Sequence, residues 1–153
     1  MGLDMYLKRN YPTRDKTVTI DGVVMAGVNW VATEVAYWRK ANQIHNWFVE
    51  NVQHGEDNCG TYDVSNDDLI NLVKLCKEVL ASRDPSIANP TEDANFVKTA
   101  EELLPTTSGF FFGSTEYDDG YEEDLELTIE KLEPLISPDD TGDYPFYEYS
   151  SSW

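Results

Sequence analysis

The sequence predicts a single α+β domain in which a mostly antiparallel sheet is covered by three or four helices. The chain has 153 residues, of which 41% are hydrophobic, and this suits one domain with a real core. Strand-like segments lie at both ends of the chain, and segments with helical spacing lie between them. Because no repeat and no linker divides these segments, residues 1–153 are expected to form one domain.

The first elements are strands. In residues 2–8, apolar side chains alternate with polar ones, as a half-buried strand requires. Residues 10–15 contain a proline and two charges and are expected to form a loop. Asp21-Gly22 lies between the β-branched runs 18–20 and 23–25, and this pair of residues tolerates the positive φ of a hairpin turn.

A long helix is predicted next, from Thr33 to Val52. Thr33 suits an N-cap, and an acid follows it in the first turn. On a helical wheel, one broad face collects the apolar side chains. These are Tyr37, Trp38, Ala41, Ile44, Phe48, Val49 and Val52. His45 falls in the middle of that face and Asn42 at its edge.

The second half alternates turns with regular elements. A short strand is expected at 62–64, and a helix capped by Ser65 follows it and ends before Asp84-Pro85. Further helices are predicted at Asn95–Leu104 and Asp118–Ile136, the second with Pro134 near its end. Gly109–Gly113 encloses three phenylalanines and suggests a buried central strand. A last strand is expected over Tyr144–Tyr149.

Charge is the strongest compositional feature. The net charge is −18, and it is unevenly spread: residues 1–52 carry six Lys/Arg and five Asp/Glu, whereas residues 53–153 carry five and twenty-four. Such a chain repels nucleic acid and anionic membranes and attracts basic partners. A solvated, solubilising surface or halophilic adaptation would give the same composition.

One acidic cluster stands out as a candidate partner-binding face. It consists of Glu116, Asp118, Asp119, Glu122, Glu123 and Asp124. The spacing fails the EF-hand pattern, and acids are common at the start of a helix, where the dipole is positive. No metal site is therefore assigned, although the acids could bind a divalent ion adventitiously.

A ligand-binding wall is the second hypothesis. His and Asn on the apolar side of a helix need buried partners, and a core histidine bonded to a backbone carbonyl or a Tyr hydroxyl would meet that need. The alternative is a pocket in which stacking and hydrogen-bonding groups contact a planar, nucleotide-like ligand. Its wall would consist of Tyr37, Trp38, Arg39, Asn42 and His45.

Catalytic motifs are absent from the sequence. There is no P-loop, G-x-G-x-x-G, H-E-x-x-H or G-x-S-x-G, so no cofactor is implied. A nucleophile–base pair of Cys59 with His45 or His54 matches no known spacing. Cys59 and Cys76 are expected to be reduced thiols, with Cys76 in the core. Without a secretory leader or an apolar run of membrane length, a cytoplasmic protein is expected.

Four segments carry a resemblance to a family of short proteins encoded by tailed bacteriophages and prophages. They are MGLDMYL at the start, Glu34–Cys59 (EVAYWRKANQIHNWFVENVQHGEDNC), Glu102–Asp118 (ELLPTTSGFFFGSTEYD) and the ending YSSSW. The family has no established activity, so no site residues carry over. The resemblance implies a phage context, in which small proteins often modulate the host and its antiviral defences.

The favoured expectation is a non-enzymatic phage protein that antagonises a host factor. Its acidic C-terminal half would dock on a basic host protein or a nucleic-acid-binding complex, as a nucleic-acid mimic would. Sequestration of a nucleotide-like ligand is the alternative. A small hydrolase or nucleotide-modifying enzyme using His45 is a third hypothesis. A structural or oligomeric accessory protein, associating through Tyr144–Tyr149 and Trp153, is a fourth.

Overall fold

The computed structural model describes residues 2–13, 17–136 and 145–153, which form six strands and four α-helices. The strands are β1 (Asp4–Pro12), β2 (Thr17–Ile20), β3 (Val23–Ala26), β4 (Trp30–Arg39), β5 (Thr61–Val64) and β6 (Phe146–Ser152). The helices are α1 (Asn42–Asn51), α2 (Asn66–Ala81), α3 (Ala94–Leu103) and α4 (Asp119–Ile136), with a 3-10 turn at Pro90–Glu92. The predicted α+β class is confirmed.

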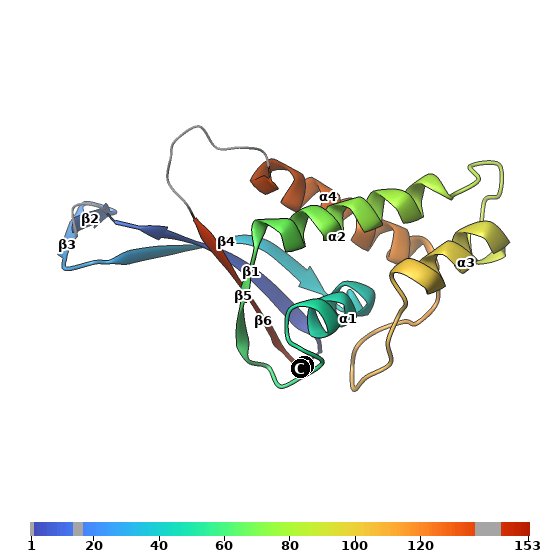
Figure 1. Ribbon diagram of the computed structural model, residues 1–153, viewed down its shortest axis with the longest axis horizontal. Coiled ribbons are helices and arrows are strands. Elements are labelled where there is room, and N and C mark those ends of the chain that lie inside the picture. Colours follow the sequence, from blue (N-terminus) through green and yellow to red (C-terminus); the bar gives the residue numbers. More distant parts are fainter. Residues whose placement is uncertain (1, 14–16, 137–144) are drawn as a thin grey trace.

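The main sheet has four strands in the order β4-β1-β6-β5, and each neighbouring pair is antiparallel. The helices lie to one side of this sheet, and α2 and α4 run next to each other (Figure 1). Leu3, Met5 and Leu7 are fully buried, as the alternation in residues 2–8 predicts. β1 continues to Pro12, so the predicted loop at 10–15 is wrong for residues 10–12.

Strands β2 and β3 form a separate two-stranded sheet that projects beyond the main sheet at one end of the molecule (Figure 1). We call residues 17–26 the arm. Asp21 and Gly22 both have positive φ, so the predicted Asp-Gly hairpin is confirmed. At its root, the Thr13 N–H donates to the Asn29 carbonyl at 2.9 Å.

The core lies between the sheet and the helices. The rings of Phe48 on α1 and Tyr149 on β6 stack with centroids 3.9 Å apart and planes 8° from parallel. The thiol of Cys76 on α2 is buried, as predicted, and burial raises its pKa to about 12. Cys59 is exposed, and neither cysteine is in a disulfide.

Helix α2 begins where its sequence predicts. The Ser65 hydroxyl accepts a hydrogen bond from the Asp68 N–H, and the Asp68 carboxylate accepts one from the Ser65 N–H. This reciprocal pair satisfies two backbone donors that the helix itself leaves free. The predictions for β5, α3 and α4 are also confirmed, and α4 includes Pro134. β6 begins at Phe146, whereas Tyr144, the first residue of the predicted strand, lies outside the described residues.

The helix predicted from Thr33 is wrong in its first half. Residues 30–39 form β4, and the chain then turns at Lys40, whose φ is 61°, before α1 begins at Asn42. In β4 the buried Ala36 and Trp38 alternate with the exposed Tyr37 and Arg39, and aromatic and β-branched residues favour such a pleated surface. Trp38 faces inward whether the segment is given the helical period or the strand period. The helical wheel therefore cannot distinguish the two structures at this residue.

The strand predicted at Gly109–Gly113 is also wrong. The segment is a turn in which Phe110 and Phe111 are 73% and 47% exposed and only Phe112 is buried. A Cβ on Gly109 would clash with the Phe112 ring, so the glycine allows that ring to fold back over the turn. Phe111 has a φ of 61°, which is incompatible with a strand.

Candidate functional site

Helix α4 presents carboxylates along its whole exposed side. At 3.6 residues per turn, six of them fall within an arc of about 100°. We call this set the α4 acidic stripe: Asp119, Glu122, Glu123, Glu126, Glu130 and Glu133. Five of the residues are exposed and Glu122 is half-buried. The opposite side of the helix buries Tyr121, Leu125, Thr128 and Leu132.

Half of the stripe pairs with cations. Arg83 donates to Glu122 at 2.9 Å, Lys131 lies 3.2 Å from Glu130, and Lys77 of α2 contacts Glu133. Within the described residues, no ion pair joins Asp119, Glu123 or Glu126 to a base. These three carboxylates therefore have no basic partner in the part of the chain that the structure describes.

Arg83 also joins three elements at the start of the stripe. It follows α2, donates to Glu122 on α4, and contacts the Asp93 carboxylate at 3.2 Å. Asp93 is buried and caps α3 by accepting the Phe96 N–H. The sequence reasoning missed this network because its members are far apart along the chain.

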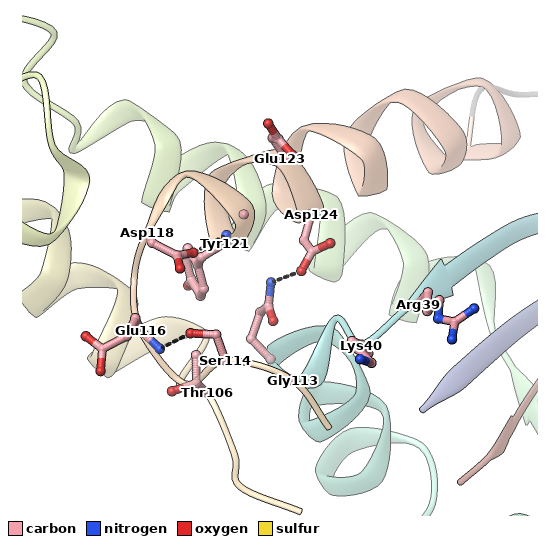
Figure 2. A pocket seen from close by; sticks show the side chains of 12 residues that line it. Arg39, Lys40, Thr106, Gly113, Ser114, Glu116, Asp118, Tyr121, Glu123 and Asp124 are labelled. Atoms are coloured by element: carbon pink, nitrogen blue, oxygen red, sulfur yellow. Dashed lines mark hydrogen bonds between the residues drawn. The ribbon is translucent and has the colours of Figure 1, made fainter. Parts of the chain in front are cut away.

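A hollow of about 270 Å³ lies at the first turn of α4 (Figure 2). Its acidic wall comprises Glu116, Asp118, Glu123 and Asp124, and across from it are Arg39 and Lys40, at the end of β4 (Figure 2). Four of the six residues predicted as a partner-binding face thus lie around one hollow. Of the other two, Asp119 lies on the exposed stripe and Glu122 pairs with Arg83.

Asp124 differs from the other acids around the hollow because burial dominates the surroundings of its carboxylate. Burial raises its pKa to about 6, and the hydrogen bond from the Gln43 side chain, at 3.0 Å, opposes part of that rise (Figure 2). Gln43 is itself buried on α1. Sequence reasoning assigned Gln43 no role, because on the predicted helical wheel it falls on the polar side with Asn46 and Glu50, away from the apolar face.

Asn42 fastens the loop before α4 to helix α1. Its side-chain amide donates to the carbonyls of Phe112 (3.1 Å) and Ser114 (2.8 Å), and its carbonyl accepts the Thr107 N–H at 3.0 Å. The residue is 1% exposed. The side-chain amide and carbonyl of Asn42 are thus bonded within the protein, so the residue holds a loop in place and is not presented to a ligand.

His45 is likewise held from both sides. Its Nδ1 lies 2.7 Å from the Tyr149 hydroxyl and its Nε2 lies 3.1 Å from the Asp57 carboxylate. The Trp153 indole N–H donates to the other oxygen of Asp57. His45 is 1% exposed, and burial raises the pKa of Tyr149 well above its usual range. This is the core histidine bonded to a tyrosine that the sequence offers as the simpler interpretation.

The remaining residues of the predicted ligand wall are dispersed. Trp38 is 1% exposed, and its indole N–H donates to the Thr128 hydroxyl at 2.9 Å, so its ring cannot stack on a ligand. Tyr37 faces the other side of β4 and bonds to Asp4. Only Arg39 of the five borders the hollow. The pocket wall predicted from Tyr37, Trp38, Asn42 and His45 therefore has no geometric basis.

A scan against protein-family models and searches of curated proteins and solved structures found no match to the chain. Within the described residues, no helix has both the length and the apolar character that crossing a membrane requires. Nor do three His, Cys, Asp or Glu side chains converge as metal ligands in that part of the chain. The site must therefore be interpreted from its own chemistry.

Proposed function

We propose that the protein acts by binding, and that the α4 acidic stripe docks on a basic surface of a host protein or nucleic-acid-binding complex. The observation that carries the proposal is the alignment of six carboxylates on one exposed helix face. The resemblance to phage proteins supplies the context, in which the target is a host factor such as an antiviral defence component. In that role the protein is a non-enzymatic antagonist.

The spacing of the stripe supports nucleic-acid mimicry. From Asp119 to Glu133 the helix rises about 21 Å, so the six residues are on average about 4 Å apart along the axis. One strand of duplex DNA carries a phosphate charge about every 3.4 Å along its axis. A protein surface that binds a phosphate backbone with Lys and Arg meets a similar density of negative charge on α4.

The free carboxylates favour recognition of a partner over a purely internal role. Asp119, Glu123 and Glu126 have no cation within the described chain, so a basic partner supplies one without breaking existing bonds. The cations that pair with Glu122 and Glu133 lie towards one edge of the stripe, because both come from α2 and the turn after it. The negative electrostatic field of the free carboxylates accelerates the encounter with a basic surface.

A nucleotide-binding function receives less support. The hollow beside Arg39 and Lys40 is also lined by four acids, and these repel phosphate groups. An enzymatic function that uses His45 lacks an accessible base, because both ring nitrogens are bonded inside the protein. Neither alternative has an observation that favours it over docking.

The test is capture of host proteins by a tagged copy of the chain at about 0.1 M and at about 1 M salt. Between these concentrations the electrostatic screening length falls from about 10 Å to about 3 Å. Wild type is compared with Glu123→Gln/Glu126→Gln/Glu130→Gln. The control, Glu34→Gln/Glu50→Gln/Glu101→Gln, makes the same charge change at exposed residues on three other elements.

We expect wild type to capture a basic host protein at low salt and to lose it at high salt. The amount captured should fall about tenfold or more in the stripe variant and should be unchanged in the control. An equal loss of captured protein in both variants would mean that only net charge matters, and the assignment of docking to the α4 acidic stripe would then be wrong. Capture that survives high salt would also contradict the proposal.

A further inference from the structure

The arm has one wholly apolar face. In an antiparallel pair, directly opposed residues point to the same side of the sheet, and so do residues two apart on one strand. Val18 opposes Met25, and Ile20 opposes Val23. These four side chains therefore share one face, and Thr17, Thr19, Val24 and Ala26 share the other.

This face is open to solvent. Ile20, Val23 and Met25 are 50%, 62% and 38% exposed, and Val18 is half-buried. A two-stranded sheet is only marginally stable in water unless something packs on it. The arm extends away from the main sheet and the helices (Figure 1), so none of these described elements covers this face.

We propose that the arm is a self-association site, in which the apolar faces of two arms pack against each other across a two-fold axis. This inference is independent of the proposed docking function. An isologous contact requires a self-complementary surface, and an uncharged row of Val, Ile and Met side chains is complementary to its own copy.

The distribution of charge favours a second copy of the chain as the partner of this apolar face. Between Thr17 and Trp30 the only ionisable side chain is Asp21, whereas the whole chain has a net charge of −18. A basic partner finds no carboxylate on the apolar face, and an anionic membrane is repelled by the chain as a whole. Two copies joined through their arms keep their acidic stripes apart, because the arm projects at one end of the long axis and α4 lies beyond the main sheet, among the helices (Figure 1).

The size of the face sets the strength of the association. A stable interface buries roughly 1,200–2,000 Å² and involves about 20–30 residues on each side, which four side chains and their surroundings do not supply. The dimer should therefore dissociate on dilution. Raising the salt concentration should strengthen it, because screening reduces the repulsion between two acidic bodies.

The test is sedimentation velocity over about a hundredfold range of concentration, on wild type and on a matched pair of variants. Val23→Thr removes an apolar group from the proposed contact, and Val24→Thr makes the same change on the opposite face. Threonine keeps the β-branched shape that strands favour. Ile20→Thr/Val23→Thr extends the first change, and circular dichroism checks that each variant is folded.

The inference expects wild type to become a dimer at high concentration, with the dissociation constant raised at least about tenfold by Ile20→Thr/Val23→Thr and less than about twofold by Val24→Thr. A monomer throughout, or equal weakening by Val23→Thr and Val24→Thr, would overturn it. A monomer that floats with phosphatidylcholine vesicles would assign the face to lipid instead. Because salt strengthens this contact and weakens docking to a basic partner, failure of one proposal is distinguishable from failure of the other.

Discussion

Helices α1 and α4 use their polar side chains in opposite ways. On α1, Asn42 and His45 are buried and each makes its hydrogen bonds inside the protein. On α4, the free carboxylates Asp119, Glu123 and Glu126 face solvent. Buried polar groups contribute to stability when they are paired, whereas exposed charges are available to a partner. The comparison predicts that stability and partner binding can be changed separately.

The largest effect on stability is expected for Asn42→Ala. The substitution leaves two carbonyls and one N–H without their partner, and we expect the free energy of unfolding to fall by about 3 kcal/mol. Urea denaturation measures this change. Asn46→Ala is the control on the same helix, because Asn46 is only half-buried. Similar losses in the two variants would show that Asn42 does not fasten the 106–114 loop.

A smaller effect is expected for His45→Ala. Loss of the contacts with Tyr149 and Asp57 should lower the free energy of unfolding by about 2 kcal/mol, again measured in urea. His54→Ala, at an exposed position, should have little effect. Partner capture by a folded His45→Ala protein should be unchanged. If capture is lost while the fold is retained, His45 belongs to a binding or catalytic site.

The smallest effect is a pH dependence at Asp124. Its pKa is raised in the folded protein, to about 6, so the folded state binds this proton more tightly than the unfolded state does. The resulting stabilisation is complete below about pH 4 and is lost as the pH rises through about 6. After allowance for its partial exposure, the loss should be about 1–2 kcal/mol.

Asp124→Asn removes this titration. Relative to wild type, its stability should rise between about pH 5 and pH 7.5, as measured by urea unfolding at each pH. Glu123→Gln, the neighbouring exposed acid, controls for the loss of one negative charge. If both variants change the pH dependence equally, general repulsion among the acids is responsible, and burial of Asp124 is not.

Local signals in the sequence locate several elements correctly. Ser65 with Asp68 marks the start of α2, and Asp21-Gly22 marks the arm, because a cap and a tight turn depend on residues close in sequence. The stripe could also be extended from sequence. Glu126, Glu130 and Glu133 recur at three- and four-residue spacing within the predicted helix, although only the acids up to Asp124 were assigned a role.

Long-range packing explains the predictions that are wrong. Trp38 is inside in either a helix or a strand, and only its pairing with Met5 across β1 and β4 decides between them. Phe111 is exposed because Asn42 and Gly109 hold the turn around it. The bond between Gln43 and Asp124 joins residues 81 apart in the chain. Such contacts are set by the tertiary fold, and no local pattern contains them.

The most direct test of the central claim is the salt dependence of the dissociation constant for the captured basic partner. Measured with purified proteins, the constant should rise steeply with salt for wild type. The rise should be clearly shallower for Glu123→Gln/Glu126→Gln/Glu130→Gln and close to wild type for the control with three scattered substitutions. Identical salt dependence in the wild type and the stripe variant would contradict docking through α4.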